Sequence, residues 1–249
     1  GRVYLEEMLR MNHSEYGREH FDNHVGVSLV FYDNEGNRQE PTMLGGLKHA
    51  NMASDAFILA YLGAKNDTDS ILGRPIGFYD WKQLASIKDY YGYILFSKAP
   101  IIAINVSHCM LNRIYSEMVP GGHKYAFFCT HDSMIEALLA ALRVKPYELS
   151  NTIESKTPIG VKLLFEQWAE KDSKNPKKYV RVRLVYQSSE QIRKMQHLTL
   201  ENPPMSCELS FSGIEKSPNG MYPYDEFMNH IQNTLKAYTA TAQGKHPWE

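Results

Sequence analysis

Cysteine is scarce in this sequence: its 249 residues include three, at Cys109, Cys129 and Cys207. No two of them form a Cys-x-x-Cys pair, which leaves a zinc ribbon or a thioredoxin-like redox motif without support. An odd number permits at most one disulfide within the chain. Cys129 lies in an apolar run, and this setting predicts a buried thiol that packs as a small hydrophobic residue.

The sequence also lacks a long apolar run and an excess of charge. No 18 consecutive residues are apolar, so no membrane span is expected. The 27 basic and 28 acidic residues give a net charge of -1, so we expect neither nucleic acid nor a membrane surface as a partner. The N-terminal segment is mixed in charge and has no apolar core of a secretory signal. Either the chain is cytoplasmic or its original N-terminus has been removed.

What remains is the composition of a globular protein, with 43% apolar and 22% charged residues. The first half of the chain has helical periodicity, and Pro100 suits the first turn of a helix. Helices are predicted at 4–11, 54–62, 80–90 and 100–118, with polar, turn-rich segments at 31–46 and 67–77.

The second half is richer in strands. Strands are predicted at 125–129, 161–168, 179–186 and 207–211, and helices at 133–142, 190–195 and 224–238. Long connections and helices between the strands favour an α/β fold with a mixed sheet over a β-sandwich. We expect residues 1–119 to form a mainly helical cap and residues 120–249 to belong to the α/β core domain.

An adjacent histidine and aspartate, His131 and Asp132, stand where the predicted strand 125–129 gives way to a helix. Ligands of open α/β sheets bind beyond the carboxyl ends of the strands, and a helix N-terminus there suits an anion such as phosphate. His131 could donate a hydrogen bond to a phosphate oxygen, and Asp132 could give a proton to a leaving oxygen. The alternative interpretation is that Asp132 caps the helix and His131 fills a turn.

The residues around this dipeptide resemble a known family. The segment "CTHDSMIEALLAAL" resembles the His-Asp motif of the histidine acid phosphatases, branch 2 of the histidine phosphatase superfamily. Four further segments resemble, in the same order, bacterial glucose-1-phosphatases and phytases of that family: "GGLKHANMASDAFILAYLG", "KTPIGVKLLFEQW", "VRLVYQSSEQIRKMQHLTLENPP" and "LSFSGIEKSPNGMYPYDEF". The resemblance covers most of the chain.

The resemblance implies a mixed-sheet core of histidine phosphatase type with a helical cap, in a periplasmic or secreted protein. The substrate would be a small phosphate monoester, either a sugar phosphate or an inositol phosphate, and no metal or cofactor is implied. Asp132 would be the proton donor and His131 a catalytic phosphate contact. His49 and Asp55 would line the substrate pocket, although a structural role for Asp55 is an equal alternative.

The sequence departs from the family at one decisive place. The family signature RHGxRxP carries the histidine that becomes phosphorylated and the arginines that bind phosphate, but no Arg-His-Gly occurs in these 249 residues. By the resemblance, this segment and the first strand lie upstream of Gly1. We therefore expect the chain alone to be inactive and to self-associate through an exposed sheet edge. The alternative is a pseudoenzyme, or an anion-binding remnant without catalysis.

One other group of residues was considered as a metal site. His13, His20 and His24 lie close together, and His20 and His24 have the i, i+4 spacing that could bind zinc on one helical face. No third ligand is fixed by the spacing, so a solvated surface is the favoured interpretation and no metal site is predicted.

Overall fold

The computed structural model describes residues 28–32, 35, 37–64, 70–71, 74–171 and 174–242. The chain forms two compact units, each assembled from separated stretches. The first comprises residues 1–95, 148–158 and 187–205, and the second comprises 96–147, 159–186 and 206–249. The predicted division into a cap of residues 1–119 and a core of residues 120–249 stays a prediction, since these units are discontinuous in sequence.

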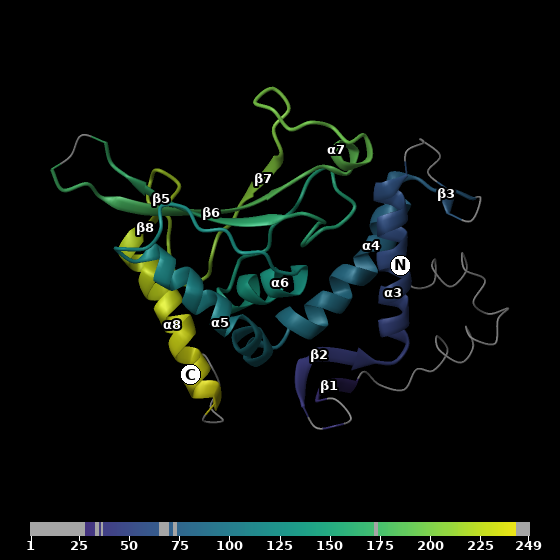
Figure 1. Ribbon diagram of the computed structural model, residues 1–249, viewed down its shortest axis with the longest axis horizontal. Helices are drawn as coiled ribbons and strands as arrows, with labels where there is room; N and C mark the ends of the chain where they lie inside the picture. Colours follow the sequence, from purple (N-terminus) through teal and green to yellow (C-terminus); the bar gives the residue numbers. More distant parts are fainter. Residues whose placement is uncertain are drawn as a thin grey trace. The chain divides into compact units, whose positions relative to one another are not determined.

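The first unit is built around two packed helices, α3 Gly46–Gly63 and α4 Phe78–Gly92 (Figure 1). Tyr61 and Trp81 lie 4.7 Å apart between ring centroids, and the Ser54 hydroxyl donates to Leu84 O at 2.7 Å. A short helix, α7 Ser189–Arg193, packs on α3 and begins with a capping box formed by Ser188 and Gln191. The predicted helices 54–62 and 80–90 are confirmed, and both are longer than their periodicity indicated.

A hairpin precedes α3 in a region for which the sequence predicted only turns. Strands β1 Ser28–Tyr32 and β2 Arg38–Leu44 pair antiparallel, with an irregularity between Val30 and Tyr32. The interpretation of 31–46 as turn-rich was therefore wrong for most of its length. The residues of β2 are largely polar, and their composition is not typical of a strand. A ribbon of two short strands, β3 Ser70–Ile71 and β4 Arg74–Pro75, lies within the predicted loop 67–77. The predicted helix 4–11 lies outside the described residues.

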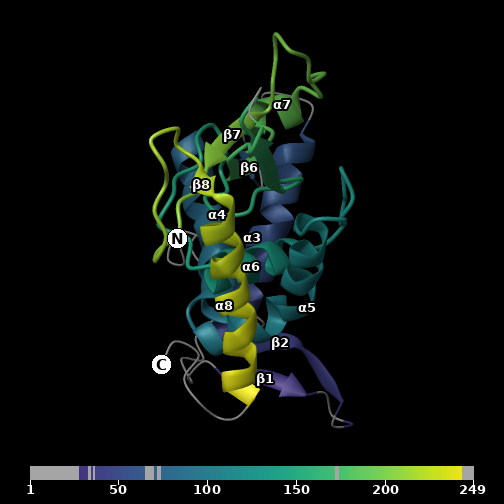
Figure 2. The ribbon, with the colours of Figure 1, turned by 90° about the vertical axis from the view of Figure 1, so that its left-hand side faces the viewer.

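The second unit contains a sheet with helices on one face (Figures 1 and 2). Strand β6 Lys178–Tyr186 is central: it pairs antiparallel with β5 Lys162–Ala169 and also with β7 Met205–Glu208 and β8 Tyr222–Pro223. Alternate residues of β6 are buried, as expected for a sheet covered on one side. The strands predicted at 161–168 and 179–186 are confirmed, whereas β7 begins and ends earlier than the predicted strand 207–211.

Three helices of this unit pack together: α5 Pro100–Met118, α6 Asp132–Ala141 and α8 Tyr224–Ala242. A five-residue π-helix, η2 Tyr93–Ser97, precedes α5, which begins at Pro100 as predicted. The last carbonyl of α5, Met118 O, accepts hydrogen bonds from Gln167 Nε2 at 3.0 Å and the Tyr224 hydroxyl at 2.7 Å. These contacts satisfy one of the carbonyls that a helix end leaves free and tie it to the sheet and to α8.

The segment between α5 and α6 contradicts the sequence prediction. Residues 125–129 form no strand, and their exposed side chains include Tyr125 and Phe127, with exposed fractions of 81% and 67%. Cys129, predicted to be buried, is exposed as well. The apolar composition was typical of a buried strand, but burial needs a neighbouring strand, and no described strand pairs with this segment. His131 consequently does not follow a central strand in this structure.

Buried His230 of α8 gives the second unit a pH-dependent stability. Its side chain donates from Nε2 to Leu142 O at 2.8 Å and lies beside the rings of Phe211 and Phe227. Burial lowers the pKa of His230, with Arg143 adding to the effect and the Leu142 hydrogen bond opposing it. The unfolded chain therefore binds the proton more readily than the folded chain does. His230 thus destabilises the fold as the pH falls below about 6.5, the ordinary value for histidine.

We predict that His230→Gln, which retains a donor for Leu142 O but cannot titrate, flattens the dependence of unfolding free energy on pH between about pH 5 and pH 7. Urea unfolding of both proteins at several pH values measures this. A variant whose pH dependence matches that of the wild type would show that His230 is not the responsible group.

Candidate functional site

His131 and Asp132 form the start of α6. His131 is the flanking residue, with an extended backbone (φ -96°, ψ 163°), and Asp132 is the first helical residue. Asp132 Oδ1 accepts a hydrogen bond from Ser133 N at 2.9 Å, while the His131 side chain makes no capping bond. Both side chains are exposed. Asp132 thus satisfies one amide of the first turn, so the capping interpretation holds in part, and this does not prevent contact with a ligand.

The helix behind this dipeptide is firmly anchored. The side chains of Ile135, Leu138 and Leu139 are buried, and α6 packs closely on α5. A rigid support matters because a general acid must be held within hydrogen-bond reach of the atom that it protonates. The positive end of the α6 dipole lies beside His131 and favours an anion there.

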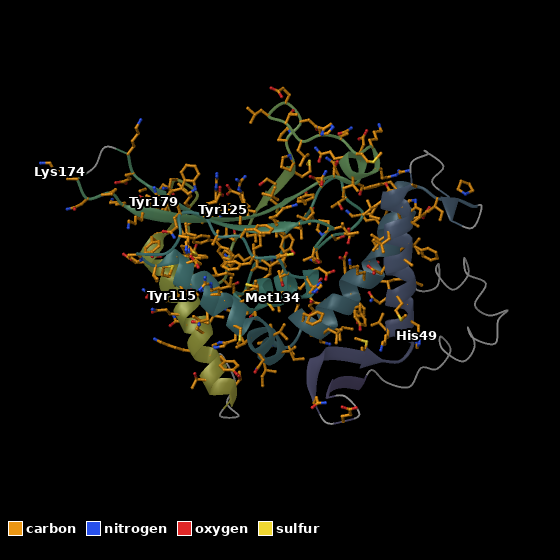
Figure 3. All side chains as sticks on the ribbon, in the orientation of Figure 1. His49, Tyr115, Tyr125, Met134, Lys174 and Tyr179 are labelled. Carbon is orange, nitrogen blue, oxygen red and sulfur yellow. The ribbon has the colours of Figure 1, made fainter. Side chains whose placement is uncertain are left out.

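The two other predicted site residues lie on α3 in the first unit. His49 is near the start of the helix, where Nδ1 lies 3.3 Å from Gly45 O (Figure 3). Asp55 is six residues further on, and a helix turns by about 100° per residue, so the two side chains leave α3 about 120° apart. The helix therefore does not present His49 and Asp55 on a common face.

Asp55 takes part in a charged cluster that the sequence did not reveal. Lys88 Nζ of α4 lies 3.4 Å from Asp55 Oδ1 and 3.2 Å from Glu154 Oε1. Glu154 is almost fully buried, whereas 47% of the Asp55 side chain is exposed. Next to Lys88, Asp89 accepts a hydrogen bond from Ser155 N at 3.0 Å; burial raises the pKa of Asp89, and that bond partly opposes the rise.

The difference in burial predicts different roles for the two carboxylates that contact Lys88. Glu154 should be structural, whereas Asp55 should contribute little to stability. Removing one partner of a buried ion pair leaves an uncompensated charge and costs about 3 kcal/mol, whereas an exposed pair is worth less than about 1 kcal/mol. We predict that Lys88→Met lowers the unfolding free energy by about 3 kcal/mol and that Asp55→Ala lowers it by less than about 1 kcal/mol. Lys88→Arg is the matched control that keeps the charge.

Urea unfolding of the three variants measures this difference. An Asp55→Ala loss as large as that of Lys88→Met would assign Asp55 a structural role and remove the reason to place it in a substrate pocket.

A second charged cluster lies on β5 and β6, on the side opposite the buried residues of β6. Glu166 accepts from Arg181 Nε at 3.0 Å and from Arg183 Nε at 2.8 Å, and the Arg181 guanidinium lies 4.9 Å from the Trp168 ring centroid. Burial would raise the pKa of Glu166, but the hydrogen bonds from the two arginines outweigh it and lower that pKa. Because both arginines already bind this carboxylate, the cluster is best explained as a sheet-stabilising contact.

In the part of the chain that the structure describes, no three His, Cys, Asp or Glu side chains lie together as a metal ion would require. The hypothetical zinc ligands His13, His20 and His24 fall outside the described residues. No single described helix is long and apolar enough to cross a membrane, and only the successive helices Phe78–Ser97 and Pro100–Met118, taken together, meet the criteria of length and composition.

Known proteins share both sequence and fold with this chain. A glucose-1-phosphatase of Providencia rettgeri is 35% identical over 202 residues, which make up 80% of this chain and 48% of that protein. The phytase AppA of Escherichia coli is 26% identical over 189 residues, or 70% of this chain and 41% of that protein. The chain thus spans about half the length of the curated relatives it matches. No protein-family model matches it.

Solved structures agree with the sequence relatives on the fold. A phytase from Citrobacter braakii superposes with a TM-score of 0.77 at 22% identity, over 93% of this chain and 59% of the phytase. The apo form of a Hafnia alvei phytase gives the same TM-score at 21% identity. The family resemblance and the α/β fold expected from the sequence are both confirmed. Over about half of their length, the chain thus resembles the glucose-1-phosphatases and phytases of the histidine acid phosphatase family.

Proposed function

We propose that this chain supplies the proton donor and one phosphate contact of a histidine acid phosphatase that hydrolyses small phosphate monoesters. The observation that carries the proposal is the position of His131 and Asp132, both exposed at the N-terminus of the anchored helix α6. The relatives named glucose-1-phosphatase and phytase support a sugar phosphate or an inositol phosphate as the substrate.

Each of the two residues has a distinct role in the proposed reaction. His131 donates a hydrogen bond to a non-bridging phosphate oxygen, where the partial positive charge of the helix end acts in the same direction. Asp132 gives its proton to the bridging oxygen as the bond between that oxygen and phosphorus breaks, so that a neutral alcohol leaves. Asp132, now a carboxylate, then accepts a proton from the water that attacks the phosphoryl group on the nucleophilic histidine.

The nucleophile itself must come from a segment with the family signature, since these 249 residues contain no Arg-His-Gly. Asp132 cannot replace it, because a proton donor to the leaving oxygen stands on the side of phosphorus opposite to the attacking group. The expectation that His49 and Asp55 line the substrate pocket stays a prediction, which α3 does not support by presenting the two side chains on a common face. The periplasmic or secreted location stays a prediction.

The proposal is tested on a form of the chain extended by its own upstream coding sequence. His131→Ala should lower kcat/KM by about 10² to 10³, the usual effect of losing one donor to a transition-state oxygen. The loss should be similar for glucose 1-phosphate and p-nitrophenyl phosphate, since His131 contacts the phosphate that both share.

The matched control is His123→Ala, which removes an exposed histidine whose Nδ1 lies 2.7 Å from Glu117 Oε2. That variant should retain the activity of the parent protein. A loss confined to one of the two substrates would contradict the phosphate-contact role of His131 and would indicate recognition of the leaving group instead.

A further inference from the structure

Helix α4 fastens another part of the same compact unit through two neighbouring side chains. That part is residues 148–158, called here the 148–158 segment. Lys88 Nζ lies 3.2 Å from Glu154 Oε1, and Asp89 Oδ2 accepts a hydrogen bond from Ser155 N at 3.0 Å. Glu154 is buried, so the segment is seated within the unit. Both contacts join described residues of one unit and therefore depend on no residue outside this chain.

The two contacts differ in how well they compensate charge. The ammonium group of Lys88 serves two carboxylates, because its Nζ lies 3.4 Å from Asp55 Oδ1 as well as 3.2 Å from Glu154 Oε1. Asp89 is instead bound by Ser155, whose amide carries no charge. A partly buried carboxylate in such a place gains when it becomes neutral. Asp89 is therefore the carboxylate of this group whose charge is least compensated.

Burial acts on Asp89 in the same direction. It raises the pKa of the Asp89 carboxyl, and the hydrogen bonds from Ser155 and the charges of Lys156 and Lys88 oppose the rise only in part. The folded chain therefore binds a proton at Asp89 more readily than the unfolded chain does. The stability gained from this proton is fully present below about pH 3.9, the ordinary value for aspartate, and is lost as the pH rises through the raised pKa.

We propose that Asp89 is an acid-sensitive clasp, which takes up a proton as the solution is acidified and then holds the 148–158 segment more firmly on α4. A neutral Asp89 still accepts the Ser155 amide with its carbonyl oxygen, so the hydrogen bond remains while the cost of a buried charge disappears. The charged groups around Asp89 come from α3, α4 and the segment, and they are Asp55, Lys88, Glu154 and Lys156.

The response of Asp89 is opposite to that of His230 in the second unit. Burial lowers the pKa of His230, so acid destabilises the fold at that residue. Burial raises the pKa of Asp89, so acid stabilises the fold at the 148–158 segment. Acidification is thus expected to tighten the first unit at Asp89 and to loosen the second unit at His230.

Amide hydrogen exchange tests the clasp where it acts. Exchange at Ser155 N, corrected for the intrinsic pH dependence of the reaction, reports how often the segment opens. Asp89→Asn is the matched variant, because asparagine keeps the volume and an acceptor for this amide but cannot titrate. Relative to this variant, wild-type protection of the Ser155 amide should rise as the pH falls from 7 to 4.5, by at most about tenfold per pH unit, the limit for one linked proton.

The two proteins share His230, so its titration cancels in their ratio. Asp80→Asn is the control: it removes a carboxylate from the first turn of α4, nine residues from Asp89, and should keep the wild-type pH dependence. A wild-type to Asp89→Asn ratio that stays constant or falls on acidification would overturn the proposal.

A titration of the wild-type protein provides a second test that needs no variant to fold. The carbon-13 NMR signal of the Asp89 carboxyl reports its protonation directly as the pH is lowered. Its midpoint in the folded chain should lie above about 3.9, the ordinary value for aspartate. A midpoint at or below that value would overturn the proposal, because Asp89 would then bind its proton no more readily in the folded chain than in the unfolded one.

Discussion

The 249-residue chain is expected to show no significant turnover of glucose 1-phosphate or p-nitrophenyl phosphate at mildly acidic pH. The reason is the missing nucleophile: no Arg-His-Gly occurs in the sequence, and the phosphate-binding arginines of that signature are absent with it. His131 offers one hydrogen bond and α6 a partial charge, whereas a phosphate dianion needs several charge-assisted contacts to bind well. Weak binding of inorganic phosphate is compatible with this prediction.

The assay of the purified chain has His131→Ala and Asp132→Ala as controls. Robust turnover that both variants abolish would contradict the prediction, because it would mean that another residue of this chain acts as the nucleophile. His13, His20, His24 and His49 would then be the candidates. Turnover that neither variant changes would indicate a contaminating phosphatase and would leave the chain itself inactive, as expected.

In the extended form, Asp132→Asn is expected to reduce kcat for glucose 1-phosphate by about 10² to 10⁴, the range found for general acid catalysis. Asparagine occupies nearly the same volume and can still accept the hydrogen bond from Ser133 N, so the start of α6 should be preserved. What the variant loses is the proton for the leaving alcohol. Steady-state kinetics of both proteins measure the loss.

The leaving group provides the internal control for this prediction. p-Nitrophenolate is a far weaker base than a sugar alkoxide and departs with little help from a proton donor. Asp132→Asn should therefore impair p-nitrophenyl phosphate hydrolysis much less than glucose 1-phosphate hydrolysis. Equal losses on both substrates would contradict the proton-donor role and assign Asp132 to positioning of phosphate or of the helix backbone.

The sequence predicted those elements whose local signals agree with their packing. Pro100 correctly indicated the start of α5, and the strand predicted at 179–186 agrees with β6, in which the structure buries alternate residues. The helix α6 was predicted because its apolar residues recur at helical spacing and meet α5. In each case the partner that buries the apolar face lies within the described part of the chain.

Features whose packing partner is missing from the described residues, or lies far away in the sequence, were predicted wrongly or not at all. The apolar run 125–129 has the composition of a buried strand, yet its burial depends on a neighbour that the described residues do not provide. Lys88 and Glu154 are 66 residues apart, and no local pattern signals their contact. His131 and Asp132 were identified by a family motif rather than by physical pattern alone, which shows how little a dipeptide reveals by itself.

The most direct test of the account is a phosphatase assay of the chain extended upstream by its own coding sequence. An extended protein that supplies an Arg-His-Gly segment is expected to hydrolyse glucose 1-phosphate, whereas the 249-residue chain is not. An extended protein that carries the segment, folds and binds phosphate but hydrolyses no monoester would contradict the account and favour an anion-binding pseudoenzyme.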